Sequence, residues 1–146
     1  MNSYVFMTDS DSDLPYEYVD KYDLKMVYMP YMIDGVEYLD DLGRNGKQAE
    51  YFDNMRKGVS PVTSLLPTPV YLEYFEPILA EGRDILFIAF SSHMSSTINN
   101  IRTAIEEMQE KYPERRIVLV DTLSISAPMG PMSLSGKSSS RRNRMR

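Results

Sequence analysis

The stretch from Asp84 to Met108 constrains the fold most strongly, because its hydrophobic pattern changes twice over a short distance. It begins with a continuous apolar run at residues 85–90, which is rich in β-formers and predicts a strand buried on both faces. It ends with apolar residues at helical spacing, namely Ile98, Ile101, Ala104, Ile105 and Met108. Between them, residues 91–97 carry a hydroxyl at nearly every position. Strand, polar turn and helix in this order are how an open α/β sheet builds a binding site.

The chemistry of that turn suits a small anion. A helix N-terminus offers unpaired backbone N–H groups and a partial positive charge, and serine and threonine hydroxyls add donors that rotate to fit. No lysine or arginine lies between Arg83 and Arg102, so the site would be weakly charged and would favour a monoanionic carboxylate over a phosphate. The alternative is that Ser95 or Ser96 merely caps the helix while the other hydroxyls face water. The residues alone leave both interpretations open.

The composition is that of an ordinary globular domain. The 146 residues suffice for one domain with a real core, and the hydrophobic fraction of 42% and charged fraction of 25% are typical. The chain has no cysteine, which excludes a disulfide framework or a thiolate metal site and fits a cytoplasmic location. The first residues lack the pattern of a signal peptide, and the run at 85–90 is far too short to span a bilayer. We therefore expect a cytoplasmic protein without an integral membrane segment.

Charge divides the chain into two parts. Five of the 16 basic residues follow Pro131, where no acidic residue occurs. The rest of the chain therefore has 11 basic and 21 acidic residues. Such an acidic body repels phosphates, which argues against nucleic acid as a partner. Residues 127–146 are dense in serine and arginine and lack apolar periodicity, so we expect a disordered basic tail. The expected organisation is an α/β domain at residues 1–126 followed by this tail.

Strand and helix patterns alternate along the domain. The expected strands are residues 4–7, 24–29, 85–90 and 117–120, and the expected helices are residues 14–22, 47–56 and 98–108 and one that begins at Thr68. Asp34-Gly35 predicts a hairpin between two short apolar segments. Asp13 and Thr68 are expected to cap their helices, and Pro77 to bend or weaken the second of these. The alternation predicts a three-layer α/β/α fold with a mostly parallel sheet.

Polar clusters follow three of the expected strands, at residues 8–13, 91–97 and 121–126. The carboxyl ends of parallel strands meet at one edge of a sheet, so these clusters are expected to lie together. Thr63-Ser64 would reach the same place from a loop. The sequence therefore predicts a single hydroxyl-rich edge.

Four segments resemble motifs of the DegV family. Ser91–Thr97, read SSHMSST, resembles the family's S-S-x-L-S-G-T, and Thr8–Pro15 resembles its opening T-D-S-x-S-D-L-P. Thr63-Ser64 with Pro67–Pro69 resembles T-S-x-P-S-P, and Asp121–Ser126 is similar to a D-S-x-S-x-S-like stretch. The order agrees over roughly residues 4–126. This chain departs from the family in having a serine in place of the glycine of the first motif and one extra residue within the third.

The resemblance implies a protein that binds long-chain fatty acids such as palmitate, needs no cofactor and is not itself an enzyme. In some members the acyl chain is presented to a fatty acid kinase. Carried onto this sequence, Ser64 and Ser95 would hold the carboxylate, helped by Thr63, Ser91 and Ser92. The acyl chain would lie on apolar residues, for which the 11 methionines are suited, although methionine also simply fills cores.

The resemblance also implies a second α/β domain, with the ligand between the two domains. It stops near Ala127, about halfway through the usual family length, so we expect a truncated form. An uncovered apolar face predicts weak binding or pairing with another copy into a homo-oligomer.

The strongest rival is an enzyme. Asp9 and Asp11 follow an apolar strand, as in Mg²⁺-dependent phosphotransferases of the haloacid-dehalogenase type, where one carboxylate attacks phosphorus and the other works as acid–base. Asp13 stands where that motif expects threonine or valine. The three aspartates also resemble a calcium loop, but Leu14 replaces the required glycine. A solvated turn explains the same residues.

His93 is the only histidine, and it lies beside serines. A Ser–His nucleophile is one interpretation, but no G-x-S-x-G elbow surrounds these serines. No second histidine or cysteine is available for a metal site with it. We expect no catalytic role for this residue.

Overall fold

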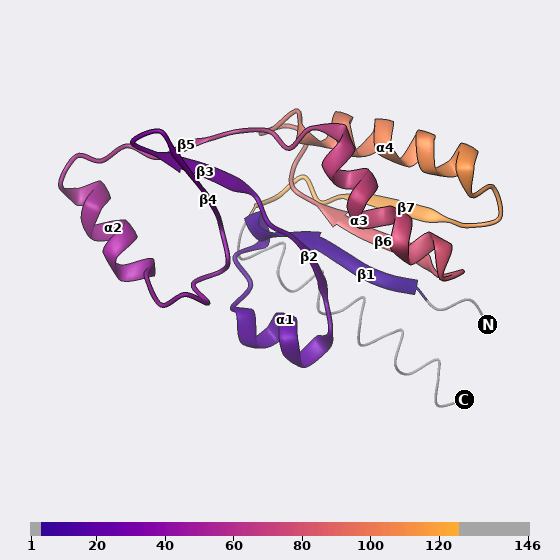
Figure 1. The fold of residues 1–146 in the computed structure, drawn as a ribbon, viewed down its shortest axis with the longest axis horizontal. Helices are drawn as coiled ribbons and strands as arrows, with labels where there is room; N and C mark the ends of the chain where they lie inside the picture. The colour runs from indigo at the N-terminus through magenta and orange to yellow at the C-terminus, as the bar shows by residue number, and fades with distance from the viewer. Residues whose placement is uncertain (1–3, 126–146) are drawn as a thin grey trace.

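A computed structural model describes residues 4–125 of the chain. The expected basic tail at residues 127–146 and the last residue of the fourth motif, Ser126, lie outside the described residues. Figure 1 shows that the described chain consists of a layered body and an arm that extends from it. The arm comprises residues 30–63, and the body comprises the rest.

The body is built on a four-stranded parallel sheet within the described residues, with the order β2-β1-β6-β7. Its strands are β2 (Lys25–Val27), β1 (Tyr4–Asp9), β6 (Asp84–Ala89) and β7 (Ile117–Asp121). Parallel neighbours need crossover connections, which here contain α1 (Tyr16–Tyr22) and α4 (Thr97–Lys111). A further helix, α3 (Thr68–Ala80), leads from the arm into β6.

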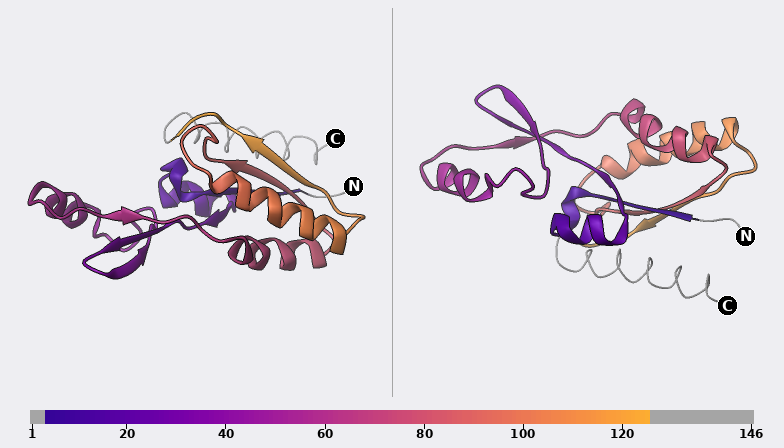
Figure 2. Two further views of the ribbon diagram at one scale, coloured as in Figure 1. Left: turned by 90° about the horizontal axis from the view of Figure 1, so that it is seen from above. Right: turned by 60° about the horizontal axis from the view of Figure 1, so that its bottom comes forward.

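Helices cover both faces of this sheet, which confirms the predicted α/β fold (Figure 2). Successive strand side chains point to opposite faces, so each strand supplies two cores. Val5, Met7 and Phe87 lie on the face that packs against α3 and α4. Phe6 lies on the opposite face, where it packs with Val19 of α1. The expectation that β6 is buried on both faces is met, because its side chains contribute to both clusters.

The arm contains a second, antiparallel sheet with the order β4-β3-β5, together with α2. Its elements are β3 (Pro30–Ile33), β4 (Val36–Leu39), α2 (Gln48–Arg56) and β5 (Val62–Thr63). The predicted hairpin is confirmed, since Asp34 and Gly35 have φ values of 49° and 79°, as a tight turn with two left-handed residues requires. The ring of Tyr51 on α2 packs edge-on against Tyr31 of β3, with centroids 5.3 Å apart.

The arm is fastened to the body at its base. The side chain of Arg44 forms two hydrogen bonds with Asp20 of α1, at 2.8 and 2.9 Å, and lies over the ring of Tyr16. The N–H of Met29 donates to the hydroxyl of Ser10, which follows β1. The entry to the arm is therefore held at the carboxyl end of β1.

Two predicted helix caps are wrong. Asp13 ends a single 3₁₀ turn in the left-handed conformation, with its N–H bonded to Ser10, and α1 begins only after Pro15. Thr68 is the first residue of α3, and Pro67 occupies the cap position with no side-chain bond. The prolines set these boundaries, because their fixed φ is compatible with a helix start and they need no N–H partner.

The helix α3 continues through Pro77 to Ala80. Ile78 and Leu79, which follow the proline, are buried in the core and hold this last turn in place. Within residues 4–125, the chain contains no helix that is long and apolar enough to cross a membrane.

Candidate functional site

The polar segments that follow β1, β6 and β7 lie at one edge of the sheet, as predicted (Figure 1). Carboxylates at the strand ends connect these polar segments by hydrogen bonds. The Oδ2 atom of Asp9 accepts the N–H of Phe90 at 3.2 Å, which links β1 to β6. The Oδ1 atom of Asp121 accepts the N–H of Ser92 at 3.2 Å, which links β7 to the same loop. The loop after β6 is therefore held from both sides.

Two of the serine hydroxyls in this loop form hydrogen bonds within the loop itself. Ser91 is buried, its Oγ accepts the N–H of His93, and its carbonyl accepts two further N–H groups of the turn. Ser95 Oγ accepts the N–H of Thr97 at 3.2 Å and shares a hydrogen bond of 2.8 Å with the hydroxyl of Thr97. Ser96, at the cap position of α4, makes no side-chain cap bond. Ser95 therefore lies at the amino end of α4 and satisfies one of its free N–H groups.

The segment after β5 reaches the same helix end. Leu66 is buried in the core, and its carbonyl accepts the side-chain amide of Asn100 in α4 at 2.8 Å. Ser64, two residues earlier, is exposed. The segment carrying Ser64 and the loop carrying Ser95 therefore meet near the first turn of α4.

Thr63 is placed differently. It pairs with Tyr31 in the arm sheet and lines a cavity of about 510 Å³ between that sheet and α2. Other residues that line this cavity include Asp11, Asp40, Tyr51 and Phe52. The structure thus brings Ser64, Ser91, Ser92 and Ser95 to one end of the body, whereas Thr63 faces the arm cavity.

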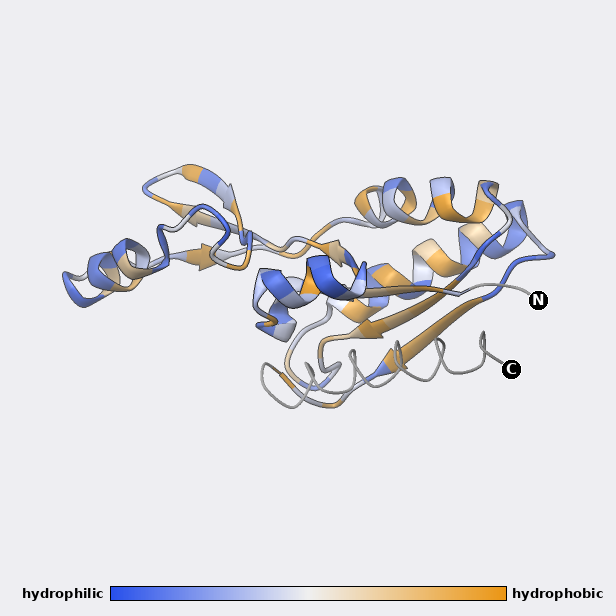
Figure 3. Ribbon diagram, turned by 90° about the horizontal axis from the view of Figure 1, so that it is seen from below, coloured by the Kyte–Doolittle hydropathy of each residue, from blue (hydrophilic) through white to orange (hydrophobic). Residues whose placement is uncertain are grey.

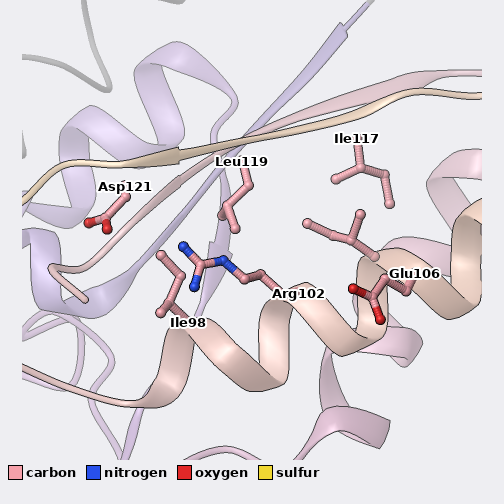
Figure 4. Close-up of a pocket in the computed structure, with 7 residues that line it drawn as sticks. Ile98, Arg102, Glu106, Ile117, Leu119 and Asp121 are labelled. Carbon is pink, nitrogen blue, oxygen red and sulfur yellow. The ribbon is translucent and has the colours of Figure 1, made fainter.

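A second hollow lies along β7 and α4 (Figure 4). Its volume is about 300 Å³, and its floor is apolar, formed by Ile98, Ile105, Ile117 and Leu119. Arg102 and Glu106 stand at its rim, with the Arg102 side chain extending toward the end of β7 (Figure 4). None of the predicted site serines lines either hollow.

The carboxylates after β1 are strongly perturbed. Burial, and then the charge of Asp11, raise the pKa of Asp9 to about 8, although the nearby N–H groups of Phe90 and Asp11 act in the opposite direction. Burial, followed by the charges of Asp40 and Asp13, raises the pKa of Asp11 to about 6. Asp9 is therefore mostly neutral at pH 7, which is unsuitable for an attacking carboxylate.

The metal-dependent alternatives find no support in this geometry. Residues 4–125 contain no group of three or more histidine, cysteine or acidic side chains arranged to hold a metal ion. His93 is exposed, and its imidazole makes no hydrogen bond within the described part of the chain, so nothing links it to a serine hydroxyl.

The sequence analysis did not single out Tyr71, whose hydroxyl is buried beneath α3. Tyr71 is 0% exposed and packs with Phe75 and Phe87 in the core. Burial, and then the charge of Asp9, raise its pKa. Its position on the apolar stripe of α3 predicts only a core residue, so no local signal could have identified it.

Comparison with known proteins decides the family. The family model that matches, described as an uncharacterised protein of the DegV family, covers residues 4–141. The chain belongs to the DegV family. A DegV domain-containing protein of Clostridium perfringens is 36% identical over 122 residues, which are 84% of this chain and 42% of the relative. A DegV domain-containing 15.5 kDa protein of Staphylococcus aureus is 28% identical over 130 residues, covering 89% of this chain and 88% of that protein.

Solved DegV structures share the fold. A stearic acid-binding protein from Eubacterium ventriosum superposes with a TM-score of 0.80 at 22% identity, over 92% of this chain and 46% of that one. A DegV family protein from Thermus thermophilus, described by its fatty acid binding, has a TM-score of 0.77 at 25% identity, over 93% and 46%. The chain thus spans about half the length of most of the DegV relatives that it matches.

Proposed function

We propose that this DegV chain binds a long-chain fatty acid such as palmitate and catalyses no reaction itself. The observation that carries the proposal is the meeting of two hydroxyl-bearing segments near the amino end of α4, one with Ser64 and one with Ser95. The fatty acid binding described for the Thermus thermophilus relative supports the same ligand class.

In this proposal the carboxylate is held by Ser64 and Ser95, with Thr63, Ser91 and Ser92 assisting. The partial positive charge at the amino end of α4 favours an anion there. Ser91 Oγ accepts the N–H of His93, which leaves the hydroxyl hydrogen free to donate to a ligand. The placement of Thr63 toward the arm cavity makes it the least direct of these contacts.

We assign the acyl chain to the arm sheet, whose strands carry several hydrophobic residues (Figure 3). Met32 and Val62 pair across strands and so share a face, with exposed fractions of 42% and 64%. Leu65, directly after Ser64, is 49% exposed. Each buried CH₂ contributes about 0.8 kcal/mol, so the chain would supply most of the affinity and the head-group bonds the orientation.

The proposal includes two partners. The loaded protein would present its acyl chain to a fatty acid kinase in the cytoplasm, as the family resemblance implies. The exposed hydrophobic residues of the arm sheet also suit coverage by a second copy of the chain.

Native mass spectrometry of the purified protein, followed by denaturing extraction, tests the proposal. We expect a co-purifying fatty acid and renewed binding when palmitate is added to the emptied protein. The Ser64→Ala/Ser95→Ala double variant should bind at least tenfold more weakly, because each lost bond to a charged group is worth about 1.5–3 kcal/mol.

The matched control is Ser60→Ala/Ser96→Ala, which removes two exposed hydroxyls, one just before β5 and one at the start of α4. This variant should bind like the wild type. A wild-type protein that takes up no fatty acid would refute the proposed function. Equal binding by both double variants would instead refute the assignment of the head group.

A further inference from the structure

The strand β7 lies at one end of the parallel sheet, and no strand among residues 4–125 pairs with its outer side. Two backbone hydrogen bonds show which of its groups face inward. The N–H of Ile85 donates to the carbonyl of Arg116 at 2.8 Å, and the N–H of Thr122 donates to the carbonyl of Ala89 at 3.3 Å. Backbone groups alternate in direction along a strand, so the even-numbered residues of β7 face β6 and the odd-numbered ones face away. Three residues therefore direct their N–H and C=O groups outward, namely Ile117, Leu119 and Asp121.

Within the described part of the chain, this outer edge lacks the features that usually prevent an edge strand from pairing. Proteins protect such edges with lysine, proline, a bulge or a covering segment. The strand reads IVLVD, so its one charge stands at its last residue and it contains no proline. It pairs with β6 residue for residue from Ile117 to Asp121, without a bulge. All five of its side chains are only half-buried, so their apolar surface is incompletely covered.

The hollow between β7 and α4 lies beside this edge (Figure 4). Its floor includes Ile117 and Leu119 of β7 and Ile105 of α4, which pack against the main core but remain partly exposed. Side chains of directly paired residues lie next to each other on the same face of a sheet. A strand added to β7 would therefore place its own side chains against this apolar floor.

Two exposed charges of α4 lie toward opposite ends of the hollow. The Arg102 side chain extends toward Asp121, at the carboxyl end of β7 (Figure 4). Glu106 lies at the end nearer Ile117, where β7 begins. Neither charge forms a salt bridge within residues 4–125. The carboxylate of Asp121 already accepts two backbone N–H groups of the neighbouring loops, so both charges of α4 remain available to a partner.

We propose that β7 pairs in antiparallel fashion with β7 of a second copy of this chain, about a two-fold axis through Leu119. In such a pair Leu119 lies opposite its counterpart and Ile117 lies opposite Asp121, and these are the residues whose backbone groups point outward. The same axis reverses α4, so Arg102 of each copy meets Glu106 of the other. The two four-stranded sheets then join into one continuous sheet.

Charge complementarity favours a second copy as the occupant. Reversal of α4 about the axis places an acid where each copy carries a base, and a base where each copy carries an acid, so the surface is complementary to itself. The contact lies on the body of the protein and is separate from the arm sheet, to which we assigned the acyl chain. This inference does not depend on the proposed fatty acid binding.

Sedimentation velocity of the full chain, over a wide range of protein concentration, tests the proposal. We expect a dimer for the wild type. Arg102→Glu and Glu106→Arg each bring like charges together at both ends of the contact, so each should raise the Kd of the dimer at least about tenfold. An equimolar mixture of the two variants should dimerise again, because every pair then joins opposite charges. The Arg102→Glu/Glu106→Arg double variant should dimerise like the wild type for the same reason.

Glu107→Arg is the matched control, because it makes the same change of charge at an exposed position of α4 that does not line the hollow. It should dimerise like the wild type. Residue-resolved hydrogen exchange provides a second measurement. The outward amides of Ile117 and Leu119 should exchange more slowly in the wild type than in monomeric Arg102→Glu.

The outcomes that overturn the inference are distinct. A wild type that stays monomeric would refute it, and slow exchange of the Leu119 amide in that monomer would mean that residues 126–146 cover the edge. A dimer that every charge variant retains, but that Met32→Glu disrupts, would place the contact on the arm sheet and refute it as well. These results concern association alone, so native mass spectrometry with palmitate still decides the proposed function separately.

Discussion

Replacing Asp9 with asparagine should stabilise this protein at neutral pH, although the residue is almost completely buried. The side chain is 1% exposed, and burial, followed by the charge of Asp11, raises its pKa from 3.8 to about 8. In the unfolded chain the same carboxyl ionises at its ordinary pKa. Folding at pH 7 therefore requires Asp9 to take up a proton, which costs about 1.4 kcal/mol per pH unit above that ordinary pKa.

The expected magnitude is large. Between the unfolded pKa and pH 7 the cost accumulates to about 4 kcal/mol, against a typical total stability of about 5–15 kcal/mol. Asparagine has nearly the same shape, its oxygen can accept the N–H of Phe90, and it has no proton to take up. The free energy of unfolding of the variant should therefore exceed that of the wild type by up to about 4 kcal/mol at pH 7.

The sign of the pH dependence is fixed by the direction of the shift. The stabilising contribution of a carboxyl whose folded pKa is raised is fully present below its unfolded pKa. It is lost as pH rises through the folded pKa, here from about pH 4 to about pH 8. The difference in the free energy of unfolding between variant and wild type should accordingly be small at pH 4, widen up to pH 8 and stay constant above it.

Urea unfolding at pH 5, 6, 7 and 8 measures this gap. Asp13→Asn is the matched control, because Asp13 is exposed, lies beside the same carboxylates and has a φ of 50° that asparagine readily adopts. We expect it to change stability only slightly. Parallel stability curves for the wild type and Asp9→Asn between pH 5 and pH 8 would refute the reasoning, because they would mean that Asp9 is ionised in the folded protein.

Three further predictions concern packing, the arm and the site. Phe87→Ala should lower the free energy of unfolding by about 3–5 kcal/mol in urea titrations, because the ring is 0% exposed and contacts two other rings of the core; a loss below 1 kcal/mol would contradict this packing. Gly35→Ala should cost about 1–2 kcal/mol, since its φ of 79° is unfavourable for any residue with a Cβ, and an unchanged melting temperature would count against the tight turn. Asp121→Ala should weaken palmitate binding several-fold without changing the far-ultraviolet circular dichroism, because its carboxylate accepts the N–H of Ser92, and unaltered affinity would show that this tether is dispensable.

The elements that the sequence predicted well are those whose pattern is local. The amphipathic spacing of α4 and the continuous apolar run of β6 identified both, because burial on one face or on two leaves a characteristic period. Asp34-Gly35 identified the hairpin, because only a few residue types tolerate its backbone. The helix starts were less predictable, since Asp13 is a good capping residue that is bonded elsewhere.

The sequence by itself determined the alternation of strands and helices, the family, and the edge at which polar side chains collect, because each follows from residues adjacent in the chain. Only the tertiary structure decided that the segment around Val62 joins the hairpin in a separate sheet, since strand pairing depends on chain closure over a long loop. It also decided the burial of Asp9, which raises the pKa of its carboxyl to about 8. Burial and the electrostatic field of distant residues set a pKa, and neither is written in the local sequence.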